Sequence, residues 1–116
     1  MTKNAKVACL ADRKCVPCAG GTPPLRGEQL EKLQARLDGW DVVEGHHLSK
    51  LYAFKDFAGA MRFVDRVGEL AEREHHHPWI HFTWGKVKIE IWTHKIDGLT
   101  ESDFILAAKI DRLPAE

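Results

Sequence analysis

The chain has 116 residues, of which 44% are hydrophobic and 29% are charged, as is typical of one soluble globular domain. Its 17 basic and 17 acidic residues give a formal net charge of zero, so it lacks the basic field that favours nucleic-acid binding. No apolar run approaches the roughly 20 residues of a membrane-spanning helix, and the N-terminus lacks the apolar core of a signal peptide. We therefore expect a cytoplasmic protein that binds neither a membrane nor nucleic acid directly.

Residues 1–23 are predicted to form an irregular tail that contains all three cysteines, Cys9, Cys15 and Cys18. The run "AGGTPP" at its end is rich in residues that interrupt regular structure. An odd number of cysteines without an export signal argues against a disulfide framework. The spacing in "CVPC" fits half a zinc site or a redox pair, but no well-spaced fourth ligand lies nearby. A reduced tail without either role is the simpler interpretation, and the sequence leaves the role of the cysteines open.

The remaining chain, 24–116, is predicted to form the folded domain. A helix is expected over 25–37, because leucines recur there at helical spacing: Leu30, Leu33 and Leu37. Gly39 follows this helix as its expected C-cap. The stretches "WDVVEG" and "HHLSKLYAF" predict two strands around a turn at 44–46. Asp56 is expected to cap a long helix over 57–74, whose apolar residues form one stripe.

Pro78 prevents the long helix from continuing past the histidines that precede it. Two alternating stretches follow, 79–84 and 87–94, joined by "GK". Thr100 then opens a last helix that ends before Pro114. The order α-β-β-α-β-β-α predicts an α+β fold in which three helices pack on one face of a four-stranded antiparallel sheet.

Five of the seven histidines lie in the segment 75–94, "HHHPWIHFTWGKVKIEIWTH". A two-residue turn at "GK" would pair Trp84 with Val87 and give the hairpin one apolar face. The same count places Trp79 opposite Trp92, His81 opposite Glu90, and His77 opposite His94. Directly opposed side chains have Cβ atoms about 4.5 to 5.5 Å apart. We therefore expect imidazoles from both ends of this segment to share one site.

Three interpretations of this cluster remain open from the residues alone. Imidazole titrates near pH 6.5, so one histidine can donate a proton while another accepts one. Three histidines can instead bind zinc, although the chain has no H-E-x-x-H pair. A solvated, histidine-rich loop requires neither role. Two carboxylates accompany the cluster: Glu72 stands one helical turn before His76 and is expected to face it, and Asp103 in "TESD" is suited to cap the last helix.

The pattern E-x-x-x-H-H-P at Glu72, His76, His77 and Pro78, followed at fixed spacing by Trp84, His94 and Asp103, resembles the signature of the pterin-4a-carbinolamine dehydratase family. The stretches "DFAGAMRFVDRVGELAE" and "THKIDGLTESDFILAAKID" resemble the same family, so the resemblance covers about residues 24–113. It implies a hydro-lyase that converts 4a-hydroxytetrahydropterin to quinonoid dihydropterin. Such an enzyme recycles the tetrahydrobiopterin of aromatic amino acid hydroxylases. The resemblance also implies a small-molecule pterin substrate, a homodimer or homotetramer, and neither a metal nor an organic cofactor.

The resemblance also implies roles for individual residues. His76 and His94 are the expected acid/base groups, and His77 is expected to hold the pterin and to remain available for proton transfer. Glu72 and Asp103 are expected to orient these histidines. The residues expected to bind substrate are His77, Trp84, Thr93 and Lys95, with the backbone around "THK" offering donors and acceptors to the ring.

Animal members of that family also act as dimerisation partners of a transcription factor. A binding protein with the same fold is therefore the alternative function. The sequence leaves open which hydroxylase is served, which side chain the pterin carries, and whether the assembly is a dimer or a tetramer.

Overall fold

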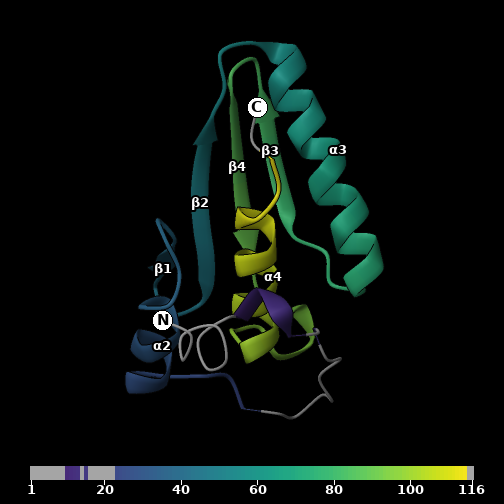
Figure 1. Cartoon of the computed structure of the whole chain (residues 1–116). Coiled ribbons are helices and arrows are strands. Elements are labelled where there is room, and N and C mark those ends of the chain that lie inside the picture. Colours follow the sequence, from purple (N-terminus) through teal and green to yellow (C-terminus); the bar gives the residue numbers. More distant parts are fainter. Residues whose placement is uncertain (1–9, 14, 16–22, 115–116) are drawn as a thin grey trace, which may run out of the picture.

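The structure is a computed structural model that describes residues 10–13, 15 and 23–114 (Figure 1). Within this part of the chain, the strands are β1 Asp41–Val43, β2 His47–Ala53, β3 Trp79–Thr83 and β4 Lys86–Ile91. They form one antiparallel sheet with the order β1-β2-β4-β3. The helices are α2 Glu28–Gln34, α3 Phe57–Glu74 and α4 Glu101–Asp111, and two short 3-10 helices are η1 Leu10–Asp12 and η2 His94–Ile96. The predicted α+β fold and its element order are confirmed, and no helix of the described residues is long and apolar enough to cross a membrane.

The core lies between the sheet and the helices that cover one of its faces (Figure 1). The inward side chains of β4, Val87, Ile89 and Ile91, are completely buried. They meet side chains of α3 and α4, among which Phe63 and Phe104 are also inaccessible. Burying an aliphatic or aromatic side chain stabilises a fold by about 1.5 to 3 kcal/mol, so this layer fixes where both helices lie.

Different interactions start and terminate α3. The Asp56 carboxylate accepts a hydrogen bond from the Gly59 N–H at 2.8 Å, which confirms the predicted N-cap. At the other end, His75 adopts a left-handed conformation with φ of 55°, and its N–H donates to the Glu72 carbonyl at 3.3 Å. This residue turns the chain away from the helix axis immediately before the histidines and Pro78.

The predicted register of the second hairpin is wrong by two residues. The turn lies at Trp84 and Gly85, so that Thr83 pairs with Lys86. Because side chains alternate with a period of two, this shift leaves every side chain on its predicted face and changes only its partner. The Gly85 carbonyl accepts a hydrogen bond from the Phe54 N–H at 2.7 Å, and a Cβ atom on Gly85 would lie 2.9 Å from the Phe54 oxygen. A contact with the end of β2 therefore accompanies this turn, and the hairpin sequence alone does not reveal it.

The partners of three side chains differ from the prediction as a result. Trp79 pairs with Glu90 instead of Trp92, and His81 pairs with Lys88 instead of Glu90. His77 and His94 lie beyond the paired strands, which begin at Trp79 and end at Ile91. The first helix is also shorter than predicted and is capped by Ala35, whereas Gly39 lies further along with φ of 81°.

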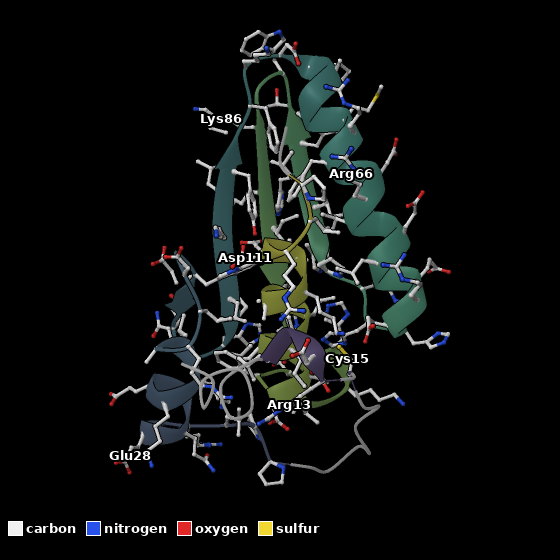
Figure 2. All side chains as sticks on the ribbon, in the orientation of Figure 1. Arg13, Cys15, Glu28, Arg66, Lys86 and Asp111 are labelled. Atoms are coloured by element: carbon white, nitrogen blue, oxygen red, sulfur yellow. The ribbon has the colours of Figure 1, made fainter. Side chains whose placement is uncertain are left out.

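The last helix begins as the sequence predicts. Thr100 is its N-cap, and Thr100 and Asp103 form a reciprocal capping box. At the other end, the Asp111 carboxylate accepts hydrogen bonds from Lys50 Nζ at 2.8 Å and from the Tyr52 hydroxyl at 2.6 Å (Figure 2). Both ends of α4 are thus fixed, and the first turn, which faces the histidine segment, is held in place.

The N-terminal region predicted as a tail is described only at residues 10–13 and 15. Leu10 is 2% exposed and belongs to the same core cluster as the domain. Cys9 and Cys18 lie outside the described residues, so the predicted "CVPC" pair can be followed only at Cys15.

Candidate active site

A cavity of about 300 Å³ lies where the end of α3, the entry to β3 and the segment after β4 meet. Its lining residues are His75, His76, His77, Trp92, Thr93, His94 and Lys95. The structure thus brings His77 and His94 to one cavity, as predicted, although the two residues do not pair within the sheet. This volume lies at the lower end of the range of about 300 to 1,000 Å³ that small-molecule sites occupy.

His76 is held by a completely buried carboxylate. The Oδ1 atom of Asp103 accepts a hydrogen bond from His76 Nε2 at 2.6 Å. Its Oδ2 atom accepts hydrogen bonds from the Thr100 N–H at 2.7 Å and from Thr93 Oγ1 at 2.9 Å. A buried carboxylate is tolerated only when such donors satisfy it. Because the proton on Nε2 is directed to Asp103, Nδ1 is the ring atom of His76 that can exchange a proton with a bound molecule.

The predicted pairing of Glu72 with His76 is wrong. Glu72 Oε2 instead accepts a hydrogen bond from His77 Nε2 at 2.7 Å. The left-handed conformation of His75 changes the chain direction, so the spacing of an unbroken helix no longer applies at His76. Both side chains of the Glu72–His77 pair are exposed, at 78% and 59%, so water competes with this contact.

An aromatic wall borders the cavity. The Trp92 ring lies 4.6 Å from the His94 ring, centroid to centroid, and stacks almost parallel on Trp79 at 6.1 Å. The predicted proximity of the two tryptophans is therefore present, although Trp79 pairs with Glu90 and Trp92 lies just beyond the end of β4. Trp84, which was expected to bind substrate, lies at the hairpin turn, is 63% exposed, and is not among the residues that line this cavity.

Sequence reasoning missed the part played by His46. Its ring lies 5.2 Å from the Trp92 ring, and its Nε2 donates to Asp97 Oδ1 at 2.7 Å. Asp97 directly follows η2, which His94 begins. The turn between β1 and β2 thus contacts the segment that carries His94. The adjacent histidines at 46 and 47 were the only signal in the sequence. They were assigned to the turn and strand around them, so the contacts of His46 with Trp92 and Asp97 were not predicted.

The described residues contain no group of three or more His, Cys, Asp and Glu side chains arranged to hold a metal ion. At His76 and His77, each imidazole instead meets a carboxylate. Cys15 is half-buried, and burial together with the neighbouring Glu74 carboxylate raises the pKa of its thiol to about 12. It is therefore a neutral thiol near pH 7, which is unfavourable for both metal binding and nucleophilic attack.

The chain resembles one protein family over most of its length. A family model described as "Pterin 4 alpha carbinolamine dehydratase" matches residues 23–113. A Rubrobacter xylanophilus protein named "Putative pterin-4-alpha-carbinolamine dehydratase" is 60% identical over 104 residues, which cover 90% of this chain and 97% of that protein. A Rickettsia bellii protein of the same name is 54% identical over 105 residues, covering 90% of this chain and 93% of its own.

Two solved structures share the fold. A Brucella melitensis protein described as a transcriptional coactivator/pterin dehydratase is 30% identical, with a TM-score of 0.72 over 76% of this chain and 95% of the other. A pterin dehydratase-like protein described as a RuBisCO assembly factor in the alpha-carboxysome is 28% identical. Its TM-score is 0.55, over 64% of this chain and 87% of its own.

Proposed function

The chain belongs to the pterin 4 alpha carbinolamine dehydratase family, and from this premise we propose that it dehydrates a 4a-hydroxytetrahydropterin to the quinonoid dihydropterin. The observation that carries the proposal is the cavity at which His76, His77 and His94 meet, with His76 bonded to a buried carboxylate. This arrangement supports proton transfer to and from a small, flat molecule bound in the cavity.

The reaction requires two proton transfers. The C4a–O bond breaks, the proton on N5 is removed, and the electron pair left on N5 forms the C4a=N5 double bond. Hydroxide is a poor leaving group, so it must receive a proton and depart as water. We assign the two transfers to His76 and His94. Asp103 compensates the positive charge of His76 whenever that ring carries its second proton.

The other lining residues suit binding of the ring. Trp92 offers an aromatic face beside His94, and the backbone of Thr93 to Lys95 offers peptide donors and acceptors to a heterocycle. His77 also lines the cavity, and its exposed contact with Glu72 lets it adjust around the pterin. No step of this scheme uses a metal or an organic cofactor. We extend the proposal to a cytoplasmic homo-oligomer that recycles tetrahydrobiopterin for an aromatic amino acid hydroxylase.

The experiment follows the ultraviolet signal of the carbinolamine in the presence of the purified protein. The protein should accelerate its decay, and His76→Ala or His94→Ala should remove most of the acceleration. His81→Ala is the matched control, because His81 lies on the exposed face of β3 and contacts Glu90 at 2.8 Å instead of the cavity. Activity should also survive exhaustive chelation. A double variant of His76 and His94 with wild-type activity would contradict the assignment.

A binding function is the second candidate. It is favoured by two large apolar side chains on α3, Phe57 and Met61, which are both 45% exposed. Exposed apolar residues on one helix are typical of an association surface. Phe57→Ser together with Met61→Ser should then reduce the mass measured in solution. If the same variant keeps full dehydratase activity, association and catalysis are separate functions.

A further inference from the structure

Glu74, the last residue of α3, lies two residues before His76 but is not part of the histidine motif. Its side chain is 16% exposed. Its Oε1 accepts a hydrogen bond from the Cys15 N–H at 3.2 Å, and its Oε2 lies 3.6 Å from Lys109 Nζ. Burial alone would raise the Glu74 pKa, but these two partners outweigh it and hold the pKa below its ordinary value. The carboxylate thus joins α3, α4 and the N-terminal segment at one point.

The N-terminal segment is bonded to α4 at both of that helix's ends. Lys109 Nζ, besides facing Glu74, donates to the Ala11 carbonyl at 2.9 Å. The Cys15 thiol donates to the Ser102 carbonyl at 3.5 Å, and Arg13 pairs with Glu101 in the first turn (Figure 2). Leu10 and Ala11 are buried, so the described residues 10–13 and 15 pack against α4.

These contacts span the same gap as the proposed catalytic hydrogen bond. His76 belongs to the chain that leaves α3, and its partner Asp103 belongs to the first turn of α4. Cys15 connects the same two elements. Its N–H binds Glu74, two residues before His76, and its thiol binds the carbonyl of Ser102, the residue before Asp103. A hydrogen bond of 2.6 Å tolerates little change in the separation of its elements. Glu74, the Cys15 N–H and Lys109 therefore lie where they can set the distance between the end of α3 and the first turn of α4.

We propose that Glu74, with the Cys15 peptide N–H and Lys109, forms a positioning site that holds the end of α3 against the first turn of α4 and so fixes His76 on Asp103. Glu74 is a positioning residue, because it acts on the reaction through His76 and does not line the cavity. This inference rests on the proposed dehydratase function for its kinetic consequence. Its structural consequence, the state of the His76–Asp103 hydrogen bond, is measurable without any substrate.

The first test is Glu74→Gln, which keeps the size of the side chain and an acceptor for the Cys15 N–H but removes the charge that faces Lys109. We expect kcat to fall about tenfold, below the roughly hundredfold that a misplacement of 1 Å can cause, while KM changes less than about twofold. Glu69→Gln is the matched control, since it is the same substitution on the same helix at an exposed position. It should leave kcat and KM at their wild-type values.

The second test reads the His76 ring directly. In the wild-type protein, the Nε2 proton of His76 should give a resolved NMR signal from its hydrogen bond to Asp103. Glu74→Gln should broaden or shift that signal, and Glu69→Gln should not. Cys15→Pro, which removes the N–H donor, should shift it further than Cys15→Ala, which keeps that donor.

Circular dichroism then separates positioning from general stability, with all variants compared at a temperature at which each is fully folded. A Glu74→Gln protein with a lower melting temperature but an unchanged His76 signal and kcat would overturn the inference. If the wild-type protein has no dehydratase activity, the proposed function fails. The NMR comparison still decides the positioning role in that event.

Discussion

Replacing Asp103 by Asn should separate two roles that one carboxylate performs, capping α4 and orienting His76. Asn has nearly the same shape, and its single carbonyl oxygen can still accept the Thr100 N–H that Asp103 binds at 2.7 Å. The amide NH₂ group must then face His76 Nε2, where Asp103 accepts a proton donor at 2.6 Å. Two donors cannot share this contact, so His76 is forced into the tautomer with its proton on Nδ1.

The size of the effect follows from the kind of hydrogen bond that is lost. A hydrogen bond to a charged partner contributes about 1.5 to 3 kcal/mol, and each 1.36 kcal/mol of barrier is a tenfold change in rate. If the doubly protonated His76 depends on this bond, kcat should fall about 10- to 100-fold in the carbinolamine decay assay. The free energy of unfolding should fall by only about 1 kcal/mol, because the helix keeps its cap.

Thr100→Ala supplies the comparison that tests this reasoning. It removes the hydroxyl of the capping box but leaves the Asp103 carboxylate to accept from His76. Its melting temperature should fall, as a lost cap costs about 0.5 to 2 kcal/mol, while kcat stays within about twofold of wild type. A wild-type kcat in Asp103→Asn, or a loss of activity in Thr100→Ala as large as in Asp103→Asn, would refute the role of Asp103 in orienting His76.

Three further predictions follow from burial and charge. Glu72→Gln should lower kcat by less than about threefold in the same assay, because its pair with His77 is exposed. Cys15 should react about 10³-fold more slowly with iodoacetamide at pH 8 than an ordinary thiol, since its pKa is raised from 9.0 to about 12; peptide mapping after timed labelling measures this. The folded Glu74 pKa lies below its ordinary 4.5, so the unfolded chain binds this proton first as the pH falls. Its stabilising contribution is complete above about pH 4.5 and lost below it, so the difference in melting temperature between wild type and Glu74→Gln should shrink in acid.

The sequence predicted the type and order of the elements because hydrophobic periodicity and capping residues act locally. The Asp56 cap, the Thr100 capping box and the alternation in the second hairpin all depend on residues within a few positions. The predicted hairpin register was wrong, and the contact of Gly85 with Phe54, more than thirty residues earlier in the chain, is one that the hairpin sequence cannot reveal. The alternation itself could not reveal the error, since a shift of two residues preserves both faces.

The sequence predicted which residues form the candidate site better than it predicted which of them contact each other. The motif placed His76, His77 and His94 together, but helical spacing assigned Glu72 to the wrong histidine. That error comes from a single residue, His75, whose left-handed conformation is uncommon for residues other than glycine, although histidine adopts it more often than most. The contact of His46 with Trp92 was likewise beyond local patterns, because it joins a turn to a distant strand end.

Burial gives the two carboxylates of the site different tasks although their hydrogen bonds are nearly equal in length. Asp103 is inaccessible and bonds His76 at 2.6 Å, whereas Glu72 is 78% exposed and bonds His77 at 2.7 Å. In the buried environment the Asp103 carboxylate interacts strongly with His76, and no water can replace it. His76 therefore has one orientation. At the surface water replaces the carboxylate at little cost, so His77 can turn toward an incoming ring. The proposed dehydratase needs one proton carrier in a fixed orientation and room for a flat substrate, and this difference in burial suits both needs.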